Sequence, residues 1–147
     1  MTSNVHLANF DVERTDELVK MWRDSFESAV IADPHPLVEQ RDYLLSNVVP
    51  NNEIRLALLR GRIVGFVAAT TTSIAQLYVE VESQRQGIGT MMLNWAKSQS
   101  EGSLWLYTFE CNRTAQSFYE QHGFKIVERG FEKTWQLADI KYQWSKL

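Results

Sequence analysis

The stretch LYVEVESQRQGIGT at residues 77–90 decides the fold. Its apolar part predicts the end of a strand from Ile74 to Val81, its polar middle predicts a turn, and Gly87 and Gly89 open a helix. The first turn of a helix leaves backbone N–H groups unpaired and carries about half a positive charge, so it can bind an anion such as a phosphate. The alternative is a tight strand-to-helix turn that binds no ligand.

Two common nucleotide-binding motifs do not fit this stretch. The dinucleotide fingerprint needs a third glycine where Met92 stands, and the Gly-Lys pair of the P-loop is absent. Phosphate binding at this turn would therefore depend on the backbone, with Gly87 and Gly89 keeping side chains out of the way.

A second informative stretch is NRTAQSFYEQHGF at residues 112–124. Asn112 is a typical helix N-cap, and Gly123 is a typical helix end. Periodicity on this helix indicates packing against a core, and a tyrosine on such a face packs more often than it catalyses. The residues at helical spacing are Ala115, Phe118, Tyr119 and His122.

Hydrophobic periodicity and turn residues predict the other elements. Strands are expected at residues 5–10, 54–59, 63–71, 74–81, 104–109, 125–129 and 140–144. Helices are expected at residues 15–29, 37–47, 87–96 and 112–122. The run 63–71 is apolar on both faces, which is typical of a covered central strand, and Arg60-Gly61-Arg62 joins it to the preceding strand as a hairpin. With no repeat or linker, residues 1–147 are predicted to form a single α+β domain, a mixed central sheet of about six to seven strands flanked by about four helices.

Composition excludes several classes of protein. The chain has 147 residues, with 15 Lys and Arg against 18 Asp and Glu. This balance lacks the basic field that non-specific binding to nucleic acid or an anionic membrane requires. The longest apolar run, residues 63–69, is too short to span a bilayer, and the first residues lack a signal peptide's apolar segment. We therefore expect a cytoplasmic protein with no nucleic-acid or membrane partner, and the scattered histidines and lone cysteine predict no metal site.

Taken together, the two stretches resemble the GNAT family, the Gcn5-related N-acetyltransferases. Gln84, Gly87 and Gly89 match the family's (Arg or Gln)-x-x-Gly-x-(Gly or Ala) motif after a strand. The joint match is specific where either half alone is not, and with the predicted elements it covers essentially the whole domain. The residues that match the family's downstream pattern, Asn-x-x-Ala-x-x-Phe-Tyr-x-x-x-Gly-Phe, are Asn112, Ala115, Phe118, Tyr119, Gly123 and Phe124.

The resemblance implies a GNAT-like domain with acetyl-coenzyme A as acyl donor. The turn would bind the cofactor's pyrophosphate through its backbone, the strand would pair with the pantetheine arm and polarise the thioester carbonyl, and Asn112 would bond the arm. Tyr119 would be the general acid that protonates the departing thiolate, whose thiol has a pKa of about 8.5. Arg85 and Arg113 would either neutralise cofactor phosphates or remain solvated. The cofactor-binding residues implied are Leu77, Tyr78, Val79, Gln84, Arg85, Gln86, Gly87, Ile88, Gly89, Thr90 and Asn112.

The general base departs from the pattern of better-known members. Some place a glutamate where this chain has Ser73, and others where it has Tyr107. An amine acceptor must lose a proton to react, so Glu80, Glu110 or another carboxylate acts through water, or the acceptor enters neutral. The expected reaction is acetyl transfer to a primary amine of a small molecule or peptide by direct attack in a ternary complex. The alternative is a non-catalytic acyl-coenzyme A sensor.

Several further residues have open roles. Cys111 could carry an acetyl group in a ping-pong mechanism, but a cysteine beside a helix cap is more often packed. Trp22, Phe26 and the loop 33–36 lie where the resemblance places the acceptor, with core packing the alternative for both aromatic residues. A toxin-like enzyme acting on charged tRNA would need a basic face, which this chain lacks. The C-terminal aromatic residues serve either a homodimer interface or the core, namely Phe131, Trp135, Tyr142 and Trp144.

Overall fold

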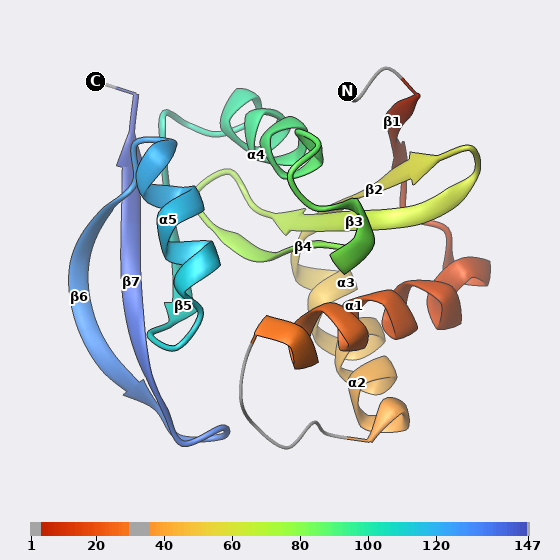
Figure 1. Cartoon of the computed structure of the whole chain (residues 1–147), viewed down its shortest axis with the longest axis horizontal. Helices are drawn as coiled ribbons and strands as arrows, with labels where there is room; N and C mark the ends of the chain where they lie inside the picture. The colour runs from red at the N-terminus through yellow and green to blue at the C-terminus, as the bar shows by residue number, and fades with distance from the viewer. Residues whose placement is uncertain (1–3, 30–35, 147) are drawn as a thin grey trace.

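Two antiparallel sheets lie side by side in the computed structural model, which describes residues 4–29 and 36–146 (Figure 1). The first sheet has the order β1-β2-β3-β4, and the second has the order β5-β7-β6. The strands of the first sheet are β1 Val5–Asn9, β2 Glu53–Leu59, β3 Arg62–Ala69 and β4 Ile74–Val79. The strands of the second sheet are β5 Ser103–Phe109, β6 Lys125–Glu132 and β7 Leu137–Ser145. The predicted α+β class is confirmed, with the strands divided between two sheets.

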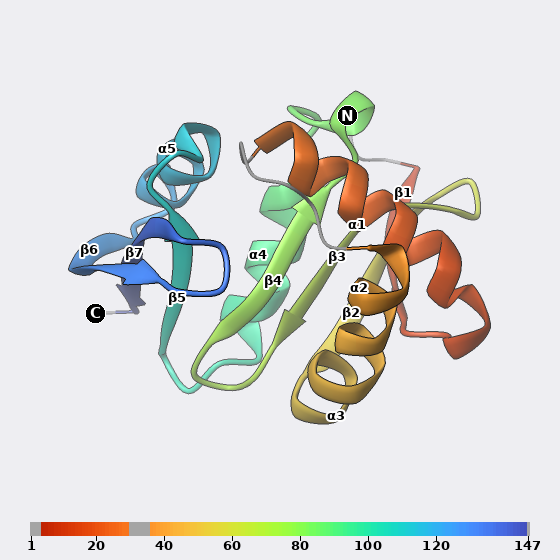
Figure 2. The same cartoon turned by 90° about the horizontal axis from the view of Figure 1, so that it is seen from below.

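The division falls between β4 and β5, which run parallel and touch only at their beginnings. A single bridge joins Ser73 to Trp105, where the Trp105 amide donates to the Thr72 carbonyl at 3.0 Å. Beyond the bridge the two strands diverge (Figure 2). The ring of Phe26 contacts both strands near their far ends, with centroids 6.5 Å from Tyr78 and 6.3 Å from Phe109. The Phe26 ring thus lies against both strands at the end where they are apart.

Helices cover both faces of the first sheet (Figure 2). The helices α1 Thr15–Ala29, α2 Leu37–Tyr43 and α3 Val49–Asn51 are on one side, and α4 Ile88–Ser98 is on the other. Every residue of β3 after Arg62 is buried, which confirms the covered central strand. The helix α5 Arg113–Gln121 packs on one face of the second sheet, where Tyr119 contacts Tyr142 and Phe124.

The predicted hairpin between β2 and β3 is present, and its turn has two residues, Arg60 and Gly61. Arg60 has φ of 52° and Gly61 has φ of 81°, so both central residues are left-handed. That combination is the type I′ turn, whose twist matches the flanking strands. Arg14 donates to the Gly61 carbonyl and thereby ties this turn to the start of α1.

Several element ends differ from the prediction. A short 3₁₀ turn, Val12–Arg14, precedes α1; Asp11 caps it by accepting the Glu13 amide at 3.0 Å, and the Thr15 hydroxyl donates to the Val12 carbonyl at 2.6 Å. The second predicted helix continues past residue 47 through a π-helical turn, Leu44–Val48, into α3, where Pro50 fits because first-turn amides need no helical partner. The strand β4 ends earlier than predicted, whereas β6 and β7 are longer.

The C-terminal aromatic residues divide between core and surface. Tyr142 is fully buried, and Trp144 packs beside Phe124 with Lys97 Nζ stacked 4.9 Å from its ring. Phe131 is 60% exposed, and Trp135 lies against Phe26. Core packing therefore accounts for Tyr142 and Trp144. No helix of the described residues is long and apolar enough to cross a membrane.

Candidate active site

A cavity of about 700 Å³ lies where β4 and β5 diverge. One wall comes from β4, and the opposite wall comes from β5 and from Tyr119 of α5. The helices α1 and α2 and the end of the β6–β7 hairpin complete it. The residues that line the cavity include Trp22, Phe26, Leu77, Tyr78, Phe109, Asn112, Tyr119, Glu132, Trp135 and Asp139.

The β4 wall offers backbone groups rather than reactive side chains. This strand pairs only with β3 among the strands of the described chain, so past the bridge its other edge faces the gap. The Val79 carbonyl accepts two side-chain donors, the buried Ser25 hydroxyl at 3.0 Å and Gln84 Nε2 at 3.1 Å. These bonds fix the end of β4 to α1 and to the turn that follows. An extended ligand can pair with such an edge as a further strand would.

The turn at residues 84–90 presents its backbone to solvent outside this cavity. Residues 84–87 are exposed, and Arg85 and Gly87 are left-handed with φ of 65° and 84°. Gly87 is the N-cap of α4, and no side chain caps this helix start. Its first amides are therefore available to an anion, as predicted.

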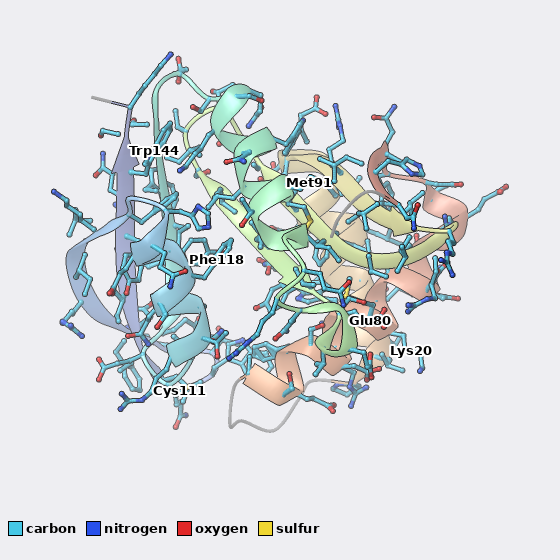
Figure 3. All side chains as sticks on the ribbon, turned by 45° about the horizontal axis from the view of Figure 1, so that its top comes forward. Lys20, Glu80, Met91, Cys111, Phe118 and Trp144 are labelled. Atoms are coloured by element: carbon cyan, nitrogen blue, oxygen red, sulfur yellow. The ribbon has the colours of Figure 1, made fainter. Side chains whose placement is uncertain are left out.

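The helix α5 supports the start of α4 directly. A Cβ added at Gly89 would lie 3.2 Å from Phe118 Cζ, so the glycine lets the ring approach the helix (Figure 3). The Thr90 hydroxyl lies 3.3 Å from His122 Nε2, within hydrogen-bond distance. Phe118 and His122 therefore have a packing role, which joins the two sequence motifs into one structural unit.

Tyr119 combines burial with access to the cavity. Only 7% of its surface is exposed, and its ring lies 5.4 Å from that of Phe124. Burial raises the pKa of the Tyr119 hydroxyl above its ordinary value, and the nearby Tyr78 adds to the shift. Burial likewise raises the pKa of Tyr78 to about 12, although Trp22 opposes the shift. Both hydroxyls are therefore protonated at neutral pH and can donate to a developing negative charge.

Asn112 has two functions open to it. Its side-chain Oδ1 accepts the Ala115 amide at 3.1 Å, which confirms the predicted N-cap of α5. The same residue lines the cavity, and its predicted bond to the cofactor stays a prediction.

Aromatic rings from three elements form the far end of the cavity. Phe26 of α1 lies 4.8 Å from Trp135 of the β6–β7 hairpin and 6.3 Å from Phe109 of β5, measured between ring centroids. Trp22 also lines the cavity while packing on Phe66. Both residues are largely buried, as the core-packing alternative predicts, and both also line the cavity, so their part in an acceptor site stays a prediction. The loop 33–36 lies outside the described residues except for Pro36.

The two carboxylates expected as bases lie away from the cavity. Glu80 pairs with Arg62 of β3, and this contact lowers the pKa of Glu80 despite partial burial (Figure 3). Glu110 is exposed and pairs with Arg129 at 3.3 Å. Neither residue lines the cavity, and neither does the exposed Cys111.

The carboxylates that do line the cavity are Glu39, Glu132 and Asp139, none of which the sequence indicated. The sequence predicted a strand that starts at residue 140. Asp139 lies just before it, so the alternation of residues did not assign its side chain to either face of the sheet. The observed strand β7 begins at Leu137, and alternation along it would have placed Asp139 opposite the buried Ile140. No group of three or more His, Cys, Asp or Glu residues in the described chain is arranged to hold a metal ion.

Comparisons with known proteins agree with this geometry. A family model described as an acetyltransferase (GNAT) domain matches residues 50–126, which include both motif stretches. Peptidyl-lysine N-acetyltransferase YjaB from Salmonella typhimurium is 26% identical over 118 residues, which cover 80% of this chain and 81% of that protein. The solved structure of apo-form YjaB from Escherichia coli has a TM-score of 0.80 at 21% identity, covering 95% of this chain and 97% of that one.

A second solved structure has the same fold with coenzyme A bound. PaiA N-acetyltransferase from Thermoplasma acidophilum, in complex with coenzyme A, has a TM-score of 0.75 at 16% identity. The match covers 96% of this chain and 98% of that one. At this identity the likeness concerns the fold alone.

Proposed function

Because the chain belongs to the GNAT acetyltransferase family, we propose that it transfers the acetyl group of acetyl-coenzyme A to a primary amine. One observation carries the proposal above the others: Tyr119 lines the same cavity as Leu77 and Tyr78 of β4. A proton donor and a free strand edge thus meet where a thioester would lie. The uncapped turn before α4 lies at the other end of the same strand-turn-helix unit.

The described residues fit the cofactor by chemistry. The amides at the start of α4 would bind the pyrophosphate, and the exposed Gly87 leaves its approach unobstructed. The edge of β4 from Leu77 to Val79 would pair with the amide groups of the pantetheine arm, and the Asn112 side-chain NH₂ would donate to the same arm. Arg85 lies in the turn and would add a positive charge beside the phosphates.

Tyr119 is the proposed general acid. Acetyl-coenzyme A supplies an activated acyl carbon and a thiolate leaving group. Because burial disfavours the phenolate, the Tyr119 hydroxyl remains protonated until the C–S bond breaks and the sulfur takes the proton. A positioned acid of this kind contributes about 10² to 10⁴ in rate. The remaining acceleration comes from holding amine and thioester together in a ternary complex.

The acceptor end suits a flexible amine. Phe26 and Trp135 provide aromatic surface, on which an alkylammonium group can lie as it enters. Because a relative carries the name peptidyl-lysine N-acetyltransferase, a lysine side chain on a peptide is the first acceptor to try. Small-molecule primary amines are the second.

The proposal is tested by isothermal titration with acetyl-coenzyme A, followed in the same preparation by a free-thiol assay with lysine peptides, amino acids and simple amines. Saturable binding together with acceptor-dependent thiol release supports the transferase. Binding without thiol release on any acceptor overturns catalysis and favours a non-catalytic acyl-coenzyme A sensor. Absence of acetyl-coenzyme A binding contradicts the proposed roles of the turn and of the β4 edge.

A further inference from the structure

The amine nitrogen must lose a proton as it bonds to the acyl carbon, yet Tyr119 can only supply one. Glu80 and Glu110 lie outside the cavity and are each held by an arginine. The proton acceptor must therefore be sought among the three carboxylates of the cavity wall, Glu39, Glu132 and Asp139.

Two of these three carboxylates already have partners. Glu132 Oε1 accepts the Trp135 amide at 2.6 Å, which closes the β6–β7 turn, and Glu39 also has an interaction partner. No lysine or arginine of the described chain lies within ion-pair distance of Asp139. Its carboxylate accepts a bond from its own backbone amide, and no cation of the described chain competes with a substrate for it.

The sheet directs Asp139 toward the acceptor end of the cavity. Asp139 is directly opposite Phe109 in the antiparallel β5–β7 ladder, so both side chains leave the same face of the sheet. The Phe109 ring contacts Phe26, which shows that this face is turned toward α1. The Asp139 carboxylate thus shares the end of the cavity that holds Phe26 and Trp135.

A glycine on the neighbouring strand makes room for this carboxylate. Gly130 of β6 is directly opposite Asp139 on the other side of β7. A Cβ added at Gly130 would lie 3.0 Å from Asp139 Oδ1, tighter than ordinary contact. Glycine weakens a strand interior, and in strands it often marks a close approach of another group. Here that group is the Asp139 carboxylate.

The charges around Asp139 make its carboxylate more basic. Burial raises its pKa above the ordinary value, and repulsion from Glu132 and Glu128 of β6 adds to this effect. The nearest cation on its own strand, Lys141, stacks on Trp105 and Tyr107 of β5.

The helices α1 and α2, which complete the cavity, add little to the net charge around Asp139. Arg23 of α1 pairs with Glu27 at 3.1 Å, and Glu39 of α2 adds a further negative charge to the wall. The charges facing the Asp139 carboxylate are therefore mostly negative, which favours uptake of a proton.

We infer that Asp139 is the general base of the acetyl transfer, and that Gly130 is a positioning residue that keeps the space its carboxylate occupies. The inference rests on the proposed function. The amine's lone pair forms the N–C bond, and the proton lost by nitrogen passes to Asp139. The C–S bond breaks with its electron pair going to sulfur, which takes the Tyr119 proton. After the products leave, Asp139 releases its proton to solvent and the Tyr119 phenolate takes one up, so the enzyme returns to its starting state.

The first test compares wild type with Asp139→Asn and with Glu128→Gln, a control that removes a neighbouring charge outside the cavity. Asp139→Asn is expected to lower kcat about 100-fold, the lower end of a positioned base's contribution. Glu128→Gln is expected to leave kcat unchanged at pH 8. An Asp139→Asn enzyme whose kcat stays within threefold of wild type, or which changes only the acceptor KM, overturns the inference.

The pH profile separates a base from a merely structural residue. Ionisation of the acceptor amine alone gives log kcat/KM a slope of one with pH. A required Asp139 carboxylate makes the slope two below its own pKa, and the slope in Asp139→Asn remains one throughout. In Glu128→Gln the break moves to lower pH, because a repelling charge has been removed. A wild-type profile without the break overturns the inference.

A readout on ligand-free protein is independent of turnover. A carbon-detected NMR titration with labelled aspartate, assigned through the Asp139→Asn spectrum, should place the Asp139 pKa above the ordinary aspartate value. This pKa should also coincide with the break in the pH profile and be lower in Glu128→Gln. An ordinary value, or one unmoved in Glu128→Gln, contradicts the environment that makes Asp139 a base.

Gly130 is tested by a double-mutant cycle. Gly130→Ala should lower kcat at least tenfold in wild type and have no effect on kcat in the Asp139→Asn background, since it acts only through that carboxylate. Equal effects in both backgrounds overturn its positioning role. If wild type releases no thiol with any acceptor, the proposed function itself fails. Activity in wild type with an unaffected Asp139→Asn variant overturns Asp139 alone.

Discussion

The two walls of the cavity are built in different ways. The first sheet is covered on both faces, and β3 is buried along almost its whole length, whereas the outer strand β6 of the second sheet is exposed except at Glu132. The covered sheet presents backbone groups through the edge of β4 and the turn before α4. The second sheet and its hairpin present side chains, such as Trp135 and Asp139.

This difference suggests a division of labour between a fixed donor side and an adjustable acceptor side. Backbone groups held between two helical layers cannot be altered by most substitutions, which suits a ligand that does not vary. Side chains on an exposed sheet can change without disturbing the core, which suits acceptor specificity. Tyr119 stands between the two, since it is packed in the core yet lines the cavity.

The strongest test of the donor side is Gly87→Glu. The substitution places a carboxylate where the pyrophosphate is proposed to bind, at a residue with φ of 84°. We expect the Kd for acetyl-coenzyme A to rise at least about 100-fold, which corresponds to about 2.7 kcal/mol. Titration calorimetry measures it.

Gly61→Glu is the matched control, because Gly61 has φ of 81° and open space around its Cβ position in the distant β2–β3 turn. It imposes the same backbone strain and the same charge on a different turn. Equal losses of affinity in both variants would attribute the effect to strain or net charge and not to the turn before α4.

The junction between the two sides is tested by Tyr119→Phe. Removing the hydroxyl should lower kcat at least about tenfold and leave the Kd for acetyl-coenzyme A nearly unchanged, because the ring still packs and only the proton donor is lost. Stopped-time thiol release gives kcat, and calorimetry gives Kd. The control is Tyr142→Phe, which removes another buried hydroxyl, one that donates to Glu120 at 2.6 Å. Turnover that is unaltered in Tyr119→Phe contradicts the acid assignment.

The acceptor side is tested by Trp135→Ala. Loss of the ring that contacts Phe26 should raise the acceptor KM about tenfold, in line with lost aromatic contact, while the Kd for acetyl-coenzyme A stays constant. Trp105→Ala is the control, since Trp105 is 39% exposed on the same sheet and outside the cavity. A changed Kd for acetyl-coenzyme A with an unchanged acceptor KM would contradict the assignment of Trp135 to the acceptor side of the cavity.

Local patterns were sufficient to predict most of the fold. The left-handed Arg60-Gly61 turn follows from a glycine between two apolar runs, and the burial of β3 follows from its apolar residues on both faces. The N-cap of α5 at Asn112 is equally local. Each of these features is encoded within about ten residues.

The features that could not be predicted depend on residues far apart in the chain. The separation of β4 from β5, where Phe26 of α1 contacts both strands, is a tertiary feature that no strand pattern reports. Glu80 was a candidate base because it lies on the predicted strand 74–81, but it pairs with Arg62 of another strand and lies outside the cavity. Asp139 could be identified as a candidate base only from the register of β7, which pairs it with Phe109 and Gly130. Strand ends and registers are set by tertiary packing, so their consequences for the site require the structure.

The smallest expected effect is on the stability of the first sheet, which helices cover on both faces. Glu17 Oε2 accepts the Ile63 amide at 3.0 Å, and Glu17 also pairs with Arg14 at 2.8 Å, so it ties α1 to β3. Burial alone would raise the pKa of Glu17, but these two partners outweigh it and lower the pKa. A depressed carboxylate pKa stabilises the folded state above the unfolded value, and this stability is lost as pH falls through the folded value.

Glu17→Gln should therefore lower Tm at pH 7, by at most about 2–4 °C for a chain of this size, and the difference should shrink as the pH is lowered below 4. The effect is small because 40% of the Glu17 side chain is exposed and solvent screens the pair. Asp16→Asn is the control, since that side chain is 87% exposed and bonds Arg41 from the helix surface. A Tm difference that persists unchanged at pH 3 would assign the effect to packing instead of charge. Constant Kd and kcat in Glu17→Gln would show that the covered sheet can lose stability without altering either wall of the cavity.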